Sequence, residues 1–472
     1  DWQRYDLKLT AALSQSTTLE VKGHREDYDW YYEGDPYTTQ SGWDLEPGDV
    51  TYWGALLQSV LSDRTFLEAH YAGWVSNDFG RSQTGSTEPW YGDYTQPIPL
   101  FSGSVWYPYD YEVGRNQIDV KASNYTDEFI AGDHEFRFGV SYSAGTAETL
   151  AFPCFGGECK WKYHYYYYPY YYTYTRLPFI YGSDNDTLSA FVDDSWQVTD
   201  NLTLNIGVRY DKNGGDIPSY PVLDNDMNPT GESFPAINNM IDWQTISPRI
   251  GLAYQVAKGK GVIRASYGKY YDGNVTGNWN DLAPGQSPAY YSWGYYYDGP
   301  FYVYDVWEPA NVALPEDLKP PETDQYALGY EHQFGSNMAV GIQAVHKKTK
   351  NLIGFEILGD GVYEMVDFAD PVTGEVYQLA SVIEEPTIRK GNRPGEGSLA
   401  PPGADYWQEY DGLFLTFNRR YSNGWSLQAS YGYSESKGRA PRMLAQSQGR
   451  VFWGVLEGSD PNHHINAEQL QQ

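Results

Sequence analysis

Residues 410–434 read YDGLFLTFNRRYSNGWSLQASYGYS, and this stretch decides the fold class. Apolar side chains recur at every second position, with Leu413 and Leu415 before the Ser-Asn-Gly turn and Leu427 after it. The positions between them carry mostly small or polar residues such as Thr416. A two-residue period places alternate side chains on opposite faces of a strand. The stretch therefore predicts a β-hairpin with one apolar face and one polar face.

The same alternation recurs along the whole chain. Further pairs of alternating segments lie at residues 5–21, 118–142, 250–267 and 326–344, and one more alternating segment lies at residues 202–210. The 472 residues include 46 Tyr and 48 Gly but only 5 Met, a composition that favours strands and turns over helices. The pattern predicts an all-β protein of about 14 strands and excludes an all-helical fold.

The connections between these segments alternate between short and long. The short ones lie at residues 14–17, 62–64, 128–133, 199–201, 257–260, 335–337 and 422–424. The long ones lie at residues 28–49, 75–116, 145–186, 212–246, 273–322 and 350–408. This alternation predicts a transmembrane antiparallel β-barrel, because such barrels have short periplasmic turns and long extracellular loops.

A soluble antiparallel sandwich or propeller is the alternative architecture. It would bury the apolar faces in a dry core, and loops longer than about 15 residues are uncommon in compact domains. The polar face of the segments is rich in Gly, Ser, Gln, Asn and Arg, which suits a wet lumen. Aromatic residues gather at segment ends, as an interfacial girdle requires: Trp196, Tyr210, Tyr270, Tyr271, Trp425 and Tyr433. These features favour the membrane barrel.

The charge of the chain excludes several classes of partner. With 32 basic and 62 acidic side chains the net charge is −30, which argues against binding to nucleic acid and against peripheral docking on anionic lipid. The chain contains no run of 18 uncharged apolar residues, so the sequence predicts no transmembrane helix. The chain starts at Asp1 without a signal sequence, so we expect that any export signal has been removed or lies upstream.

Six stretches of the chain are distinctive: LSAFVDDSWQVTDNLTLNIGVRYD at 188–211, WQTISPRIGLAY at 243–254, GVIRASYGKYYDG at 261–273, LKPPETDQYALGYEHQFG at 318–335, the hairpin at 410–434, and DPNHHINA at 460–467. Together they resemble the barrel of TonB-dependent outer-membrane receptors, specifically the Oar-like group. The resemblance implies a multi-pass β-barrel in the outer membrane of a Gram-negative bacterium. It also implies a closed barrel of about 22 strands that surrounds a plug domain.

The chain departs from the pattern of this family in its extent. A signal peptide, a carboxypeptidase-regulatory-like domain, a TonB box and a plug domain are not visible in the sequence. We therefore expect residues 1–472 to be a partial receptor barrel, an internal piece without the plug and without the first and last strands. A sheet of about 14 strands would then expose two edges.

Two functions from different classes are consistent with these features. The resemblance implies a transporter that binds a ligand at acidic, Tyr-rich outer loops and admits it through a plugged lumen. Its partners would be outer-membrane lipid, the TonB-ExbB-ExbD system acting through the plug, and a small-molecule, peptide or glycan ligand. The alternative is a surface protein that binds glycans or peptides, or mediates adhesion, without active transport. A passive porin is a weaker third reading, and the sequence contains no nucleophile, phosphate-loop, dinucleotide or HExxH motif that would indicate an enzyme.

The most unusual stretch is CFGGECKWKYHYYYYPYYYTYTRLPFIY at residues 154–181. Rigid amphipathic rings give a large contact area at low entropic cost, so Tyr-rich loops serve as recognition surfaces. Its candidate ligand-binding residues are Trp161, Tyr163, Tyr165, Tyr166, Tyr167, Tyr168, Tyr170, Tyr171, Tyr172 and Tyr174. The alternative is that these rings pack against other Tyr-rich loops, which lie near residues 290–304. Cys154 and Cys159 are the only cysteines, and their spacing suits a small local disulfide in an oxidising compartment.

Two further sets of residues are candidates for function. Oxygen-bearing side chains at near-alternate positions of an outer loop suggest a Ca²⁺ site, although a plain β-turn explains the same residues: Asp224, Asp226, Asn228 and Glu232. We predict no other cofactor. Arginines on the polar face are expected to point into the lumen, because a charged side chain facing lipid costs about 2–4 kcal/mol at the midplane: Arg137, Arg209, Arg249, Arg264 and Arg420.

Overall fold

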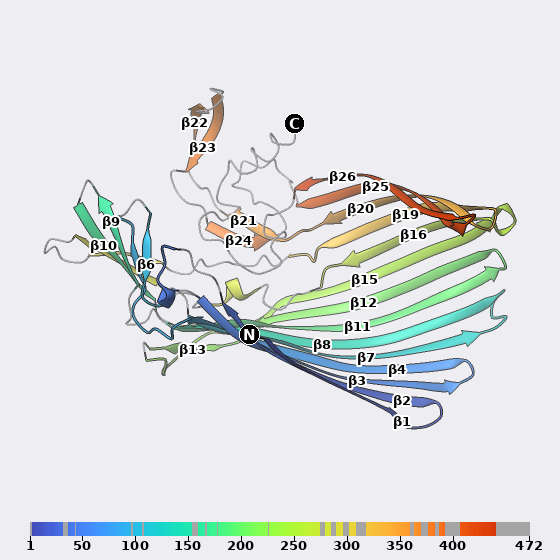
Figure 1. Cartoon of the computed structure of the whole chain (residues 1–472), viewed down its shortest axis with the longest axis horizontal. Coiled ribbons are helices and arrows are strands. Elements are labelled where there is room, and N and C mark those ends of the chain that lie inside the picture. The colour runs from blue at the N-terminus through green and yellow to red at the C-terminus, as the bar shows by residue number, and fades with distance from the viewer. Residues whose placement is uncertain are drawn as a thin grey trace.

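The structure is a computed structural model and consists almost entirely of β-sheet (Figure 1). It describes residues 2–31, 36–42, 44–95, 98–105, 108–152, 159–165, 168–176, 178–224, 226–273, 279–284, 289–295, 302–307, 318–358, 363–369, 376–382, 387–391 and 406–439. None of the helices in this part of the chain is long and apolar enough to cross a membrane. The short helices are the 3-10 turns η1 (Gln40–Gly42), η3 (Ala257–Gly259) and η4 (Asn280–Leu282).

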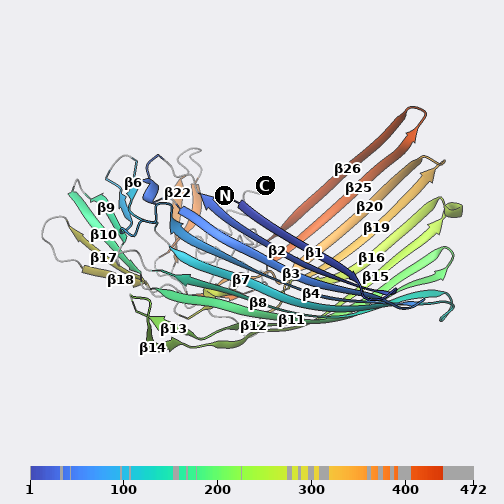
Figure 2. The same ribbon diagram turned by 60° about the horizontal axis from the view of Figure 1, so that its bottom comes forward.

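One antiparallel sheet of 14 strands dominates the molecule, and its strand order is the order of the sequence. Its strands are β1 (Trp2–Ala12), β2 (Thr17–Tyr31), β3 (Asp44–Ser62), β4 (Thr65–Ser82), β7 (Tyr109–Thr126), β8 (Asp133–Ala151), β11 (Phe179–Thr199), β12 (Leu202–Ile217), β15 (Ile237–Val256), β16 (Gly261–Tyr271), β19 (Glu322–Phe334), β20 (Met338–Lys350), β25 (Trp407–Ser422) and β26 (Trp425–Arg439). The prediction of about 14 antiparallel strands is confirmed. Strands β1 and β26 are the two edges, and the sheet curves between them (Figure 2).

Four smaller sheets occur in the long connections. The largest has six strands and is called the loop sheet below: β18 (Tyr302–Trp307), β17 (Ala289–Tyr295), β10 (Tyr168–Arg176), β9 (Cys159–Tyr165), β5 (Tyr91–Asp93) and β6 (Leu100–Ser102). The others are the strand pairs β13 (Tyr220–Leu223) with β14 (Pro229–Phe234), β21 (Gly354–Leu358) with β24 (Thr387–Gly391), and β22 (Tyr363–Ala369) with β23 (Val376–Val382).

Short turns and long connections lie at opposite ends of the main sheet, as the sequence predicts (Figure 1). The strands themselves are longer than expected. Strand β7 begins at Tyr109, inside the segment expected to be a loop, and β11 has 21 residues where about 9–11 suffice to cross a membrane. Tyr109 pairs with Ala151, which pairs in turn with Phe179, so the ladder satisfies the backbone of these extensions. The alternation of apolar and polar residues stops before the strands end, because the strand extensions have no apolar face against lipid.

The two faces of the main sheet differ in chemistry, and we call them the apolar face and the polar face. Large apolar side chains on the apolar face are exposed: Val140 is 55%, Ile250 53% and Leu328 59% exposed. The polar face carries hydrogen-bonded groups such as Ser189, whose Oγ donates to Asp211 Oδ1 at 2.6 Å. A dry core between apolar faces, which a soluble sandwich requires, is not formed by these strands. One girdle assignment is wrong: the register places Tyr270 on the polar face, where Arg249 lies 4.8 Å from its ring.

A hydrophobic core cluster of the described residues lies at the long-connection end rather than in the middle of the sheet. It comprises Ile217, Ile241, Trp243, Trp279, Leu282 and Ala283. The rings of Trp243 and Trp279 meet edge to face at 6.1 Å, and Trp243 Nε1 donates to the Leu318 carbonyl at 3.0 Å. The connection that contains η4 is thereby fixed onto β12 and β15.

Candidate functional site

The loop sheet contains most of the aromatic residues that the sequence marks for ligand binding. Figures 1 and 2 show it beyond the long-connection end of the main sheet. Three candidates lie on β9 and five on β10: Trp161, Tyr163 and Tyr165, then Tyr168, Tyr170, Tyr171, Tyr172 and Tyr174. Tyr166 and Tyr167 fall outside the described residues.

The register of the loop sheet groups these residues. Tyr172 pairs with Trp161 on β9 and with Trp293 on β17. Tyr170 pairs likewise with Tyr163 and with a second tyrosine of β17. Residues directly opposite on antiparallel strands belong to the same face, and alternate residues of one strand share a face. One face of the loop sheet is therefore built from aromatic positions, whereas intervening positions such as Thr173 belong to the other face.

The backbone pairing also joins two Tyr-rich segments that lie more than 100 residues apart in the sequence. Strand β10 pairs with β17, and β17 pairs with β18. This neighbourhood fits the interpretation that the Tyr-rich loops pack on one another, and it leaves ligand recognition open. Cys159 begins β9 and Cys154 lies outside the described residues, so the disulfide stays a prediction.

The candidate calcium loop forms the turn of the β13–β14 hairpin. Asp224 Oδ1 accepts hydrogen bonds from the backbone N–H groups of Asp226 at 3.0 Å and Asn228 at 2.9 Å. The backbone N–H of Asp224 in turn donates to the Asn228 carbonyl at 2.9 Å. Glu232 lies further along, on β14. These contacts are those of an Asx turn, which accounts for the residue types, and calcium binding stays untested.

The five candidate arginines occupy different surroundings. Arg137 pairs with Asp193 at 2.7 Å, and Arg209 contacts both Asp211 and Ser189 at 2.7 Å. The register places these two, together with Arg249 and Arg264, on the polar face.

Arg420 differs because the ladder shifts register between Arg419 and Ser422, so alternation does not assign Arg420 to a face. Its backbone N–H donates to the Asn337 carbonyl at 2.9 Å, and its neighbour Arg419 stacks 3.6 Å from the ring of Trp425.

A groove of about 720 Å³ lies on the polar face of β1, β2, β3, β4 and β7. A row of rings borders it, with His24 and Tyr52 at 5.5 Å and Tyr52 and Trp74 at 6.4 Å between ring centroids. Gly54 and Ala72 lie beside this row, and these small residues leave space for the groove. Sequence analysis missed this groove, because its residues come from separate strands and only their register aligns them.

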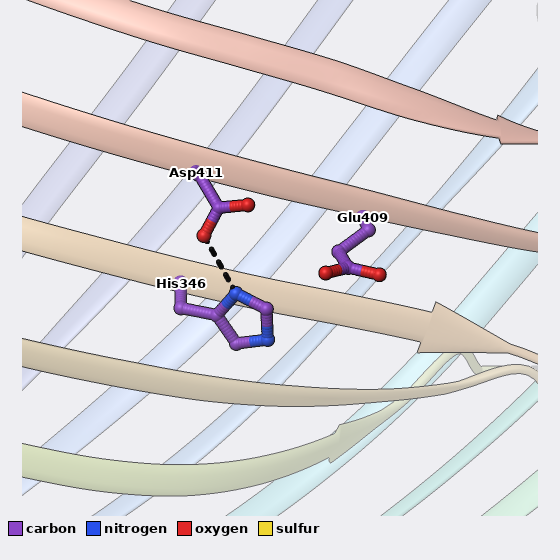
Figure 3. A group of neighbouring side chains, drawn as sticks. All are labelled: His346, Glu409 and Asp411. Carbon is purple, nitrogen blue, oxygen red and sulfur yellow. Dashed lines mark hydrogen bonds and ion pairs between the residues drawn. The ribbon is translucent and has the colours of Figure 1, made fainter.

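A second group missed from the sequence lies on the apolar-face side of β20 and β25. The ligand atoms of His346, Glu409 and Asp411 all lie within 4.8 Å of one another, the one such group among the described residues (Figure 3). His346 Nδ1 is 2.8 Å from Asp411 Oδ1. Two acidic residues two positions apart on a predicted strand, beside a strand with a histidine, are the signal that could have indicated it.

Burial changes the titration of carboxyl groups on the strand extensions, well beyond the apolar band. Burial raises the pKa of Glu148, and a nearby Glu112 adds to the effect. Burial also raises the pKa of Asp184, with Asp216 as the second cause. The hydroxyl of Tyr220, from the β13–β14 hairpin, has a raised pKa because it is buried and faces the Glu148 and Asp184 charges.

Comparison with known proteins identifies the architecture. The sequence model of the family described as "Outer membrane beta barrel domain" matches residues 101–452. The chain belongs to this family. Its apolar face therefore contacts lipid in the outer membrane of a Gram-negative bacterium, and its long connections lie outside the cell.

Relatives of this outer-membrane barrel domain include TonB-dependent transporters. The chain is 26% identical to the TonB-dependent transporter Oar of Myxococcus xanthus over 306 residues, which are 61% of this chain and 26% of Oar. These matches confirm the resemblance to Oar-like TonB-dependent receptors. The barrel domain thus spans about a quarter of this curated relative.

Solved structures support the same fold. The outer membrane transporter YddB of Escherichia coli aligns with a TM-score of 0.59 at 15% identity, over 93% of this chain and 48% of YddB. The ferric-catecholate import receptor Fiu of Escherichia coli aligns with a TM-score of 0.51 at 10% identity, over 93% of this chain and 58% of Fiu. These identities are low, so the likeness concerns the fold alone, and the assignment of residues 1–472 to one partial barrel stays a prediction.

Proposed function

We propose that this chain is the barrel wall of a TonB-dependent outer-membrane receptor that captures a ligand outside the cell and admits it through its lumen. The proposal rests on the relationship to the TonB-dependent transporter Oar and on the two-faced wall. In this proposal the TonB-ExbB-ExbD system acts through a plug domain inside the barrel. The ligand class is a small molecule, a peptide or a glycan.

The observation that carries the capture step is the register of the loop sheet. Aromatic positions from β9, β10 and β17 fall on one face, with Tyr172 between Trp161 and Trp293. Aromatic residues dominate binding hot spots because they bury a large area and lose few rotamers. A sheet fixes their backbones, which lowers the entropic cost of binding compared with a free loop.

The polar face supports the passage step. Its ion pairs and hydrogen bonds lie where a hydrated ligand would travel, for example Arg137 with Asp193 and Arg209 with Asp211. The groove bordered by His24, Tyr52 and Trp74 adds rings and charged groups to this wall. Such a lining suits polar cargo and does not suit a lipid-soluble ligand.

Binding and import can be tested separately. Cells that express the receptor are screened with fluorescently labelled oligosaccharides and peptides, and the probe that binds best is followed into the periplasm. We expect that a Tyr170→Ala/Tyr172→Ala/Tyr174→Ala variant binds the probe at least about tenfold more weakly. The matched control, Thr173→Ala/Thr175→Ala, changes the other face of the same strand and should bind normally.

Depletion of TonB distinguishes the two functional classes. Under the transporter proposal, surface binding persists without TonB while accumulation in the periplasm stops. If accumulation is the same with and without TonB, active transport is refuted. If the probe binds at the surface but never enters in either strain, the chain is a surface-binding or adhesion protein, for which the aromatic loop sheet would be the contact region.

A further inference from the structure

We propose that His346, Glu409 and Asp411 form a binding site for a divalent transition metal, with Zn²⁺ as the ion, on the outer side of the barrel wall. This site is separate from the loop sheet and from the lumen. Its three side chains project from adjacent strands of the main sheet, β20 and β25 (Figure 3).

The backbone places the three ligands in a compact triangle. Glu409 and Asp411 are two residues apart on β25, so they share one face of the strand. His346 lies directly opposite Asp411 on β20. A rigid sheet holds such ligands more accurately than a loop does, and only side-chain rotations are needed to bring the donor atoms from within 4.8 Å of one another to a common ion.

The donor set selects the metal. One imidazole nitrogen and two carboxylates match the ligands of Zn²⁺, which binds His nitrogen at about 2.0–2.1 Å and carboxylate oxygen at about 2.0–2.2 Å. Ca²⁺ and Mg²⁺ prefer shells made of oxygen alone. With three protein ligands, a fourth coordination position stays open to water or to an external ligand.

The site lies in a wet region of the outer side. It is two residues beyond Leu413, the 40% exposed side chain that ends the apolar band of β25. The next side chains outward on this face are charged, because Lys348 and Lys437 both lie near Glu409, so the surroundings of the site are polar rather than lipid. The extracellular end of the strand is the side from which external metal would approach.

Two lysines lie beside the site, and their substitution should change metal affinity in the opposite direction to substitution of a ligand. Lys348 Nζ is 3.7 Å from Glu409 Oε2, and Lys437 Nζ is 3.9 Å from Glu409 Oε1. Each ammonium group competes with a metal ion for the same carboxylate. Removal of either lysine should therefore strengthen metal binding, whereas removal of a ligand should weaken it.

A second histidine of the same sheet provides a matched control. His24 also stands between two carboxylates, but its Nδ1 faces Asp6 at 2.6 Å while its Nε2 faces Glu26 at 3.2 Å. The two carboxylates lie on opposite sides of the ring, so no single nitrogen can share an ion with both. His24→Ala should leave zinc binding unchanged.

The experiment uses the receptor purified from outer membranes in detergent and stripped of metal with a chelator. Zn²⁺ is titrated by calorimetry, and Co²⁺ absorbance reports a nitrogen-containing site of low coordination number. We expect His346→Ala and Asp411→Asn to weaken Zn²⁺ binding at least about tenfold and to remove the Co²⁺ signal. Lys348→Gln and Lys437→Gln should each tighten Zn²⁺ binding about fivefold, the effect of one unit charge near 4 Å in a water-like medium.

The outcomes separate this site from general binding by an acidic protein. Equal Zn²⁺ affinity in the wild type, His346→Ala and Asp411→Asn would overturn the proposal. Unchanged affinity in both lysine variants would also overturn it, because Glu409 would then not be a ligand. Heat-dependent mobility in SDS gels confirms that each variant is folded, and Asp411→Asn keeps the shape of the side chain.

Discussion

The assignment of the two faces can be tested with one pair of neighbouring residues on β20. Ile342 lies on the apolar face, 44% exposed, between Tyr330 and Leu415 on the adjacent strands. Gln343 lies at the same depth on the polar face, opposite Gly329 and Phe414. Ile342→Arg therefore puts a charge into lipid, whereas Gln343→Arg puts the same charge into the lumen.

The expected difference follows from the cost of an arginine on the lipid face near the midplane, about 2–4 kcal/mol. This corresponds to a decrease of roughly 30-fold to 900-fold in the folding equilibrium constant for Ile342→Arg. Gln343→Arg should change the free energy of unfolding by no more than about 0.5 kcal/mol, because the new side chain stays in water beside small and aromatic neighbours.

The measurement is urea-induced unfolding of the barrel reconstituted in phospholipid vesicles, followed by tryptophan fluorescence. The two variants should share one dependence on urea concentration and differ in the midpoint. If Gln343→Arg costs as much as Ile342→Arg, or more, the reasoning about which face meets lipid is refuted.

Two further predictions concern the extracellular end. Trp243→Ala should destabilise the core around Trp279 by about 3–5 kcal/mol, because it removes a buried ring and its hydrogen bond; faster amide exchange of residues 237–247 would report this, and unchanged exchange would contradict it. Burial raises the pKa of Glu148, so the folded chain binds protons more tightly than the unfolded chain, and the packing that buries Glu148 should weaken as the pH rises above the ordinary value of 4.5. Amide exchange of the β13–β14 hairpin should show this weakening in the wild type, while Glu148→Gln, which resembles the protonated form, should remove the pH dependence.

For the loop sheet, the sequence predicts the aromatic composition but not the pairing of its strands. The composition of residues 154–181 predicted an aromatic surface and left open whether it binds ligand or packs on other loops. Only the tertiary pairing of β10 with β17 aligned Tyr172 with Trp293. The register between segments this distant depends on the whole fold, so no local pattern of either segment could have specified it.

The calcium and metal assignments illustrate the same limit. Asp224 was a candidate ligand by spacing, but the structure uses its carboxylate to bind two backbone N–H groups of a turn. The sequence does not identify His346 as a ligand, because His346 is 65 residues from Asp411 in the chain. A site built across two strands becomes visible only when the register is known.

The sequence by itself determined the membrane architecture, because an apolar side chain at every second position and short turns at every second connection act locally along each hairpin. It thereby specified the antiparallel strand order, the apolar and polar faces, and the end that carries the large loops. The tertiary structure alone decided how far each strand continues past the membrane and which residues become neighbours there. Outside the lipid both faces of a strand are wet, so alternation loses its energetic basis, and long-range pairing then decides the structure.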